Sequence, residues 1–151
     1  MKISTKSRYA LRLMAEVARS GNSGKPVPLH EVARRQHLSR LYLSQLAAPL
    51  KNAALLKSVW GNKGGFLLAR PPQQIRLLDV VEAVDGPICI LDCVLNPGDC
   101  MRSASCSCLN VWREVNDSIV RTLANRTLAD LLEPASRTGG TSGSSDSRIA
   151  G

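Results

Sequence analysis

The chain has 151 residues, of which 3% are aromatic and 21% are charged, and a formal net charge of +8. This length suits one domain with a modest core, and an apolar content supplied mostly by Leu, Val and Ala suits a small helical protein. No stretch reaches the roughly 18 apolar residues of a membrane span, and residues 1–5 lack a signal peptide's apolar core, so we expect a cytoplasmic protein without a membrane partner.

The charge is unevenly distributed along the chain. Residues 1–70 hold 13 Lys and Arg but only two acidic residues, a net charge of +11, whereas residues 71–151 have a net charge of −3. A basic half beside a mildly acidic half is typical of nucleic-acid binding. Charge alone leaves open a basic protein without a nucleic-acid partner.

The N-terminal pattern predicts three helices. Thr5 is the expected N-cap of a first helix that ends at Gly21, and a second helix covers residues 29–36. His37-Leu38 forms a tight turn, after which Ser39 is a natural N-cap for a third helix. The buried stripe of this third helix is Leu43, Leu46, Ala47 and Leu50.

A small hairpin follows the third helix. Pro49 lies late in this helix, and proline can kink a helix, so the sequence does not fix the residue at which the helix ends. Strands are predicted over residues 55–59 and 65–69, and the glycine-rich residues 61–65 join them. A fourth helix is predicted over residues 75–84. This order is that of a winged helix-turn-helix, so the expected fold class is mainly α with a small β wing.

The rest of the chain is expected to carry a loop, a long helix and a tail. The long helix covers residues 106–125, and a short helix capped by Thr127 ends at Glu133. Trp112, Ile119 and Leu123, with Val115 or Asn116 between them, have roughly heptad spacing and predict dimerisation through the long C-terminal helix. The predicted division is a winged helix-turn-helix domain over 1–84, a cysteine-rich sensor loop over 85–105 (the cysteine loop), a dimerisation helix with the short terminal helix over 106–133, and a disordered tail over 134–151.

The third helix supplies the candidate DNA-reading residues. In a helix-turn-helix the second helix of the motif enters the major groove, and its N-terminal residues meet base edges. Arg40 can pair with guanine and Gln45 with adenine, while Lys63 at the hairpin tip can contact phosphate. The alternative is that these are solvated surface residues, and that Tyr42 is partly core. The candidates are Ser39, Arg40, Tyr42, Ser44, Gln45 and Lys63.

Five cysteines in a chain expected in the cytoplasm favour metal binding over disulfides. Cys93, Cys100, Cys106 and Cys108 have the spacing Cys-x6-Cys-x5-Cys-x-Cys, and thiolates suit zinc and iron–sulfur clusters. The spacing lacks the Cys-x2-Cys pairs of structural zinc sites, and an unstructured loop of about 20 residues wraps a cluster better than one ion. Cys106 is expected at a helix N-terminus, which favours its thiolate. Cys89, among apolar neighbours, is expected to be a buried small hydrophobe.

Five short motifs carry a resemblance to a known family. They are Ser7-Arg8-Tyr9-Ala10, Val27-Pro28-Leu29, Leu43-Ser44-Gln45-Leu46, Gly64-Gly65-Phe66-Leu67-Leu68 and Asp79-Val80-Val81-Glu82-Ala83-Val84. With the cysteine loop and Trp112, they resemble the IscR-like, Rrf-type bacterial repressors over about residues 1–133. The resemblance implies a dimeric winged-helix regulator with a cluster, 2Fe–2S or 4Fe–4S, on Cys93, Cys100 and Cys106.

The chain departs from the family pattern at three positions. In the IscR branch a histidine three residues after the last cysteine is the fourth ligand, but Leu109 stands there. In the nitric-oxide-sensing branch an acidic residue near the partner's N-terminus can serve, but Arg8 stands there. Trp60 replaces a frequent wing arginine. The fourth ligand is therefore open between Cys108, an oxygen ligand or small-molecule thiol, and none from this loop.

The sequence as a whole predicts a homodimeric transcription regulator, a repressor, that binds a pseudo-palindromic double-stranded DNA operator and senses iron–sulfur or redox status. The alternative is a zinc-stabilised or thiol-switch regulator without a cluster. A thiol redox enzyme using Cys106 and Cys108 is disfavoured because they lack the Cys-x-x-Cys spacing. The family's regulators of cysteine metabolism lack this cysteine set, so regulation of cysteine metabolism is disfavoured as well. A third alternative is a basic surface that binds a protein.

Overall fold

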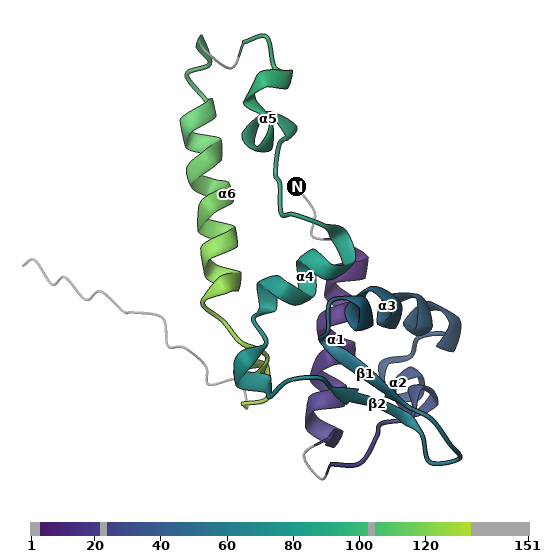
Figure 1. Ribbon diagram of the computed structural model, residues 1–151. Helices are drawn as coiled ribbons and strands as arrows, with labels where there is room; N and C mark the ends of the chain where they lie inside the picture. The colour runs from purple at the N-terminus through teal and green to yellow at the C-terminus, as the bar shows by residue number, and fades with distance from the viewer. Residues whose placement is uncertain (1–3, 22–23, 103–104, 134–151) are drawn as a thin grey trace, which may run out of the picture.

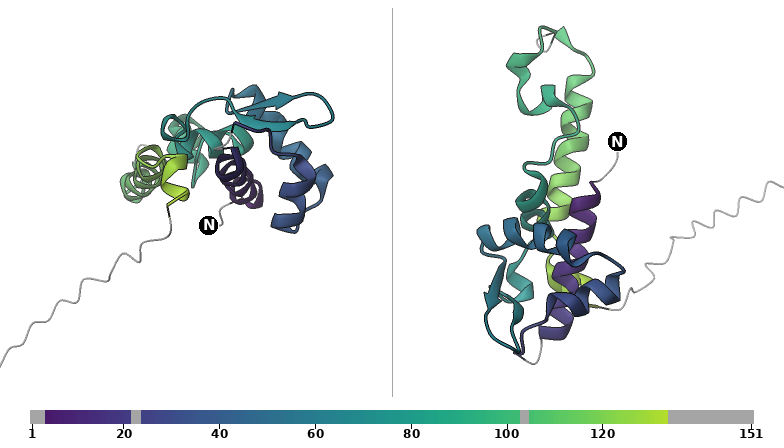
Figure 2. Two further views of the ribbon diagram at one scale, coloured as in Figure 1. Left: turned by 90° about the horizontal axis from the view of Figure 1, so that it is seen from below. Right: turned by 90° about the vertical axis from the view of Figure 1, so that its right-hand side faces the viewer.

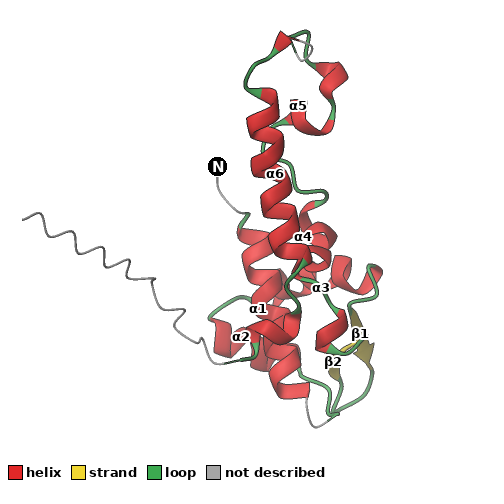
Figure 3. Cartoon of the chain, turned by 90° about the vertical axis from the view of Figure 1, so that its left-hand side faces the viewer, coloured by secondary structure: helices red, strands yellow, loops and turns green. Residues whose placement is uncertain are grey.

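The computed structural model describes residues 4–21, 24–102 and 105–133. It is elongated, with the N-terminal helices and both strands at one end and the cysteine loop at the other (Figure 1; Figure 2, right). Helices dominate, and the two strands lie at one edge (Figure 3), as the predicted fold class requires. The elements are α1 (Thr5–Ser20), α2 (Leu29–Gln36), α3 (Arg40–Asn52), β1 (Leu56–Val59), β2 (Gly65–Leu68), η2 (Pro72–Gln74), α4 (Leu77–Asp85), α5 (Asp92–Leu95), η3 (Pro97–Asp99), α6 (Leu109–Ala124) and η5 (Leu128–Leu131).

The helix-turn-helix forms where the sequence predicts it. Ser4 caps α1 in place of the expected Thr5, since its Oγ accepts a hydrogen bond from the Lys6 N–H at 3.0 Å. Between α2 and α3, His37 adopts a left-handed conformation with φ 53°. Ser39 then caps α3 by accepting from the Tyr42 N–H at 3.1 Å. These caps fix the direction in which α3 starts.

The core of the winged-helix body surrounds α1, which contacts α2, α3, α4, β2 and η5. The expected stripe of α3 is buried, and α3 continues past Pro49 to Asn52. Burying these side chains is the main favourable contribution to folding of the body. The largest fully buried apolar side chains are Leu13, Met14, Val17, Val32, Leu43, Leu50, Leu55, Ile75, Val80 and Leu128.

The wing is a two-stranded antiparallel sheet extended by one bridge. Leu56 faces Leu68 and Val59 faces Gly65 across the pair. Val27, in the loop before α2, adds a bridge to Phe66, with hydrogen bonds of 2.9 Å in both directions. The wing is thereby attached to the loop between α1 and α2.

Gly65 is required at the point where this bridge forms. A Cβ on Gly65 would lie 2.3 Å from the Val27 carbonyl oxygen, so the backbone would have to shift. Gly65→Ala should therefore lower the free energy of unfolding by about 1–3 kcal/mol, measured by urea denaturation. Gly21→Ala is the matched control, because nothing lies within 4 Å of its added methyl group. Equal stability of the two variants would contradict this account of the wing.

Two helices begin later than predicted, and for the first of them the cause is a contact between distant segments. The fourth helix begins at Leu77 rather than residue 75, because Arg76 bridges to Thr127 and the Ile75 carbonyl accepts from the Leu128 N–H at 2.8 Å. The Arg76 guanidinium also holds the pKa of Asp79 below its usual value through a hydrogen bond of 2.6 Å. The long helix begins at Leu109 rather than residue 106.

The chain therefore leaves the winged-helix body at Asp85 and returns to it at Leu128, which is fully buried beside α1. Arg19 of α1 donates to the Leu131 carbonyl at 3.1 Å and fixes η5 to the same helix. The cysteine loop and α6 lie between these two points. In the described part of the chain, no helix has both the length and the apolar content to cross a membrane.

The cysteine loop is more ordered than the expected structureless segment. α5 and η3 form within it, and the Asn96 N–H donates to the Asp92 carbonyl at 2.9 Å. Pro97 occupies the first position of η3, where its missing N–H costs no hydrogen bond. Local turns thus supply backbone hydrogen bonds that composition alone did not indicate.

Candidate nucleic-acid interface and cysteine loop

The outer face of α3 presents the predicted DNA-reading residues. Ser39, Arg40, Ser44 and Gln45 are all exposed, and the buried stripe holds the helix against the body from the other side. Leu41, Ser44, Gln45 and Ala48 recur at intervals of three and four residues, so they form one exposed row, here called the reading stripe. The stripe starts at the capped N-terminal end of α3, which is the end that meets base edges in helix-turn-helix proteins.

Tyr42 differs from its neighbours. It is half-buried, and its ring meets the Tyr9 ring edge-on with centroids 6.0 Å apart. Arg8 and Arg12 of α1 stack over the Tyr9 ring at 4.9 and 5.4 Å. The ring of Tyr42 therefore helps to fix α3 on α1, and its predicted contact with DNA remains a prediction.

A single arginine, Arg35, forms ion pairs with both acidic side chains of residues 1–70. Arg35 contacts the buried carboxylate of Glu16 and lies 3.6 Å from Glu31. The hydrogen bond to Glu16 raises the pKa of Arg35 above its usual value. Arg35 offsets one of these two negative charges, so the field of the body over residues 1–70 is dominated by the remaining Lys and Arg side chains.

The wing tip exposes both an aromatic and a basic side chain. Trp60 is 93% exposed, so it does not pack on the base of the wing, and Lys63 is exposed two residues from Gly61. Gly61 has φ 118°, and its carbonyl accepts from the Gly64 N–H at 2.9 Å, which closes the turn. His30 and His37 are exposed, as expected for surface and turn residues.

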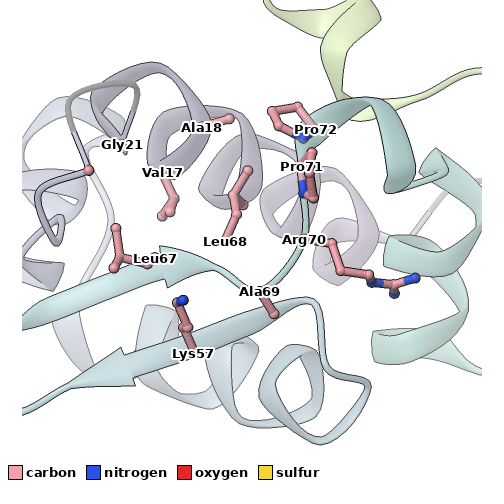
Figure 4. A pocket seen from close by; sticks show the side chains of 11 residues that line it. Val17, Ala18, Gly21, Lys57, Leu67, Leu68, Ala69, Arg70, Pro71 and Pro72 are labelled. Carbon is pink, nitrogen blue, oxygen red and sulfur yellow. The ribbon is translucent and has the colours of Figure 1, made fainter.

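A hollow of about 460 Å³ lies behind the wing, between the end of α1 and β2 (Figure 4). Val17, Leu67 and Leu68 line its apolar wall, and Lys57 and Arg70 lie at its rim. In Figure 4 the Arg70 side chain points away from Val17 and Leu67. Both cationic side chains are exposed, and they offer no enclosed polar site.

The structure brings two of the four predicted metal ligands together. Cys93 and Cys100 line a hollow of about 450 Å³ with Asp92, Met101 and Arg102. Cys106 and Cys108 are exposed and do not line it. Among the described residues, no three His, Cys, Asp or Glu side chains are gathered closely enough to hold a metal ion. The donor chemistry suits an iron–sulfur cluster, but Cys106 would have to move to the hollow to complete a three-thiolate set.

Two cysteines lie in environments that differ from those expected. Cys106 precedes α6 by three residues, and Cys108 takes the N-cap position at the positive end of the helix dipole. Cys89 is half-buried rather than a core residue, and its thiol donates to the Leu91 carbonyl at 2.8 Å. Cys108 rather than Cys106 therefore stands at the helix N-terminus.

Two polar contacts connect the cysteine loop to its surroundings, and sequence reasoning found neither. Asp85, the first residue of the loop, accepts hydrogen bonds from Ser4 (3.0 Å) and Ser7 at the N-terminus of α1. Asn116, 5% exposed on α6, accepts from the Ile90 N–H at 3.1 Å. A signal existed for Asp85: an acidic residue at the C-terminal end of a helix is unfavourable unless donors lie nearby.

One face of α6 is apolar and exposed. Trp112 is 44% and Val115 36% exposed, and Val115, Ile119 and Leu123 border a shallow hollow of about 530 Å³. Asn116 is buried and accepts a hydrogen bond from the cysteine loop, so Val115 rather than Asn116 belongs to the predicted seam. Exposed apolar side chains grouped on one helix face are typical of an interface.

Comparison with known proteins connects both regions to transcription regulators. Residues 3–134 match the family model Rrf2, described as iron-dependent transcriptional regulator. The chain is 36% identical to the HTH-type transcriptional regulator CymR of Bacillus subtilis, over 87% of this chain and 89% of that protein. It is also 36% identical to the HTH-type transcriptional regulator IscR of Cronobacter sakazakii, over 87% of this chain and 80% of that protein. The solved structure of CymR, the global cysteine regulator of B. subtilis, superposes with a TM-score of 0.71 at 33% identity, over 87% of this chain and 96% of that one.

Proposed function

Because the chain belongs to the Rrf2 family of transcriptional regulators, it is a DNA-binding regulator and not an enzyme, and we propose that it is a homodimeric repressor controlled by its cysteine loop. The resemblance inferred from its motifs is confirmed by this membership. The observation that carries the proposal is the exposed, acid-poor face of α3, joined through α4 to the cysteine loop.

The DNA contacts are assigned by position on α3 and the wing. Arg40 and Gln45 present donors that suit guanine and adenine in the major groove, and Ser39 and Ser44 can supplement them. Lys63 contacts phosphate, and its contribution carries no sequence information. Two copies joined through Trp112, Ile119 and Leu123 present two such helices, which match a pseudo-palindromic operator.

The cysteine loop holds an iron–sulfur cluster on Cys93, Cys100 and Cys106, with Cys108 as the candidate fourth ligand. Sequence identity does not decide between a CymR-like and an IscR-like regulator, since both relatives are 36% identical to this chain. The choice of an iron–sulfur cluster therefore rests on the three cysteines. When bound, such a cluster supplies a group whose presence and charge depend on iron supply and oxidants. Cys93 and Cys100 already share one hollow, which supports this assignment.

This chain's own residues can transmit a change in the loop. Asp85 fixes the start of the loop to α1, and the Asn116 side chain fixes Ile90 to α6. A ligand shifts the equilibrium between two conformations of the loop only by its differential affinity for them. The movement of Cys106 toward Cys93 is the difference between these two conformations. A thiol switch on the same cysteines, without a cluster, is the second candidate; the structure of an oxidized CymR from Staphylococcus aureus favours it.

The DNA-binding assignment is tested by Arg40→Ala. We expect specific affinity to fall by about 1–3 kcal/mol, with little change in affinity for unrelated DNA, because a guanine contact is lost. The measurement is a titration of operator and random duplexes at several salt concentrations, where log affinity should fall linearly with log salt. Lys51→Ala, at the exposed far end of α3, is the control. An equal loss on every sequence would assign Arg40 to phosphate only.

A further inference from the structure

Leu41 is a large apolar side chain in an unexpected place. It is the second residue of α3 and is 72% exposed, whereas Leu43, Leu46 and Leu50 of the same helix are at most 3% exposed. It is absent from the apolar core and from the side chains packed against that core, as far as the described residues go. Leu41 therefore contributes nothing to holding α3 on the body.

The position of Leu41 is on the reading stripe. Ser44 and Gln45 follow it by three and four residues, so their side chains lie beside it on the same face of the helix. Arg40 is its neighbour in sequence and is also exposed. Leu41 thus stands at the N-terminal end of the surface to which the proposed function assigns contact with base edges.

The major groove offers only one exposed apolar group, the C5-methyl of thymine. The other edge groups are hydrogen-bond donors and acceptors, which a leucine would leave without partners. We propose that Leu41 packs on a thymine methyl and thereby specifies a T·A pair in each half-site. The inference rests on the proposed DNA-binding function and adds a specificity determinant that charge and hydrogen bonding do not supply.

The first experiment identifies the operator preference. The wild-type protein and Leu41→Ser each select from a pool of randomised double-stranded DNA, and the selected sequences are compared. We expect the wild type to select a T at one symmetric position per half-site, and Leu41→Ser to lose that preference while keeping the rest of the site. Identical selected sequences for both proteins would overturn the inference and leave the DNA-binding function standing. Failure of the wild type to select any sequence would instead overturn the proposed function.

The second experiment uses wild-type protein and so does not depend on folding of a variant. Each selected thymine is replaced by uracil, which keeps the hydrogen-bonding edge and removes the methyl group. At one position we expect affinity to fall roughly fourfold per half-site, the effect of exposing one methylene-sized group. Leu41→Ala should bind more weakly and be insensitive to the same replacement, as a coupled pair requires. Equal affinities for thymine and uracil at every position would overturn the inference.

Discussion

Alanine at Cys93, Cys100 or Cys106 is expected to abolish the visible absorption of anaerobically purified protein. Each change removes one of the three proposed thiolate ligands, of which Cys93 and Cys100 line one hollow and Cys106 would move to it. Iron and sulfide counts should fall with the absorption, whereas the circular dichroism of the winged-helix body should not change, because none of the three side chains belongs to its core.

The remaining cysteines serve as internal controls. Cys89→Ala should keep the spectrum, because that thiol is engaged with the Leu91 carbonyl. Cys108→Ala decides the fourth ligand: an unchanged spectrum excludes it, and a shifted spectrum supports it. If the wild type carries zinc or no metal and its DNA binding still responds to oxidants, a thiol switch replaces the cluster.

Glutamate at Ile119 should convert the proposed dimer into monomers at micromolar concentration. The change places a charge in the apolar face of Trp112, Val115 and Leu123, and burying an unpaired charge there would cost several kcal/mol. Because a monomer engages one half-site, specific DNA affinity should fall roughly 100-fold or more. Light scattering and operator titration measure the two effects.

Arg121→Glu is the matched control for this change. It introduces the same side chain two residues further along α6, on an exposed position that does not border the apolar hollow. It should leave the dimer intact. A wild-type protein that is already monomeric, or a dimeric Ile119→Glu variant, would show that the two copies do not meet through this face.

Local sequence patterns predicted most of the winged-helix body. The stripe of Leu43, Leu46, Ala47 and Leu50 and the cap at Ser39 are properties of neighbouring residues, and both appear in the structure. The wing follows from glycines flanked by apolar runs, and its two strands pair from Leu56 with Leu68 to Val59 with Gly65. Short-range periodicity and capping are therefore sufficient for this part of the fold.

Contacts between distant residues account for what the sequence did not predict. The start of α4 depends on Thr127, and the role of Asp85 depends on Ser4 and Ser7. Likewise, the exposure of Trp60 depends on where the rest of the fold places the wing tip. The cysteine spacing indicates the class of ligand but not the path of the chain between the thiolates, which depends on local turns at α5 and η3.

The return of the chain to the body at Leu128 sets an order on its synthesis. About 43 residues separate Asp85 from Leu128, and at typical translation rates they take roughly 2–9 seconds to make. During that interval the nascent body lacks a side chain that is fully buried in the finished core, and the Ile75 carbonyl lacks the Leu128 N–H. The DNA-binding unit can be completed only after the cysteine loop and α6 have emerged from the ribosome, so a chain truncated before η5 would lack a finished body.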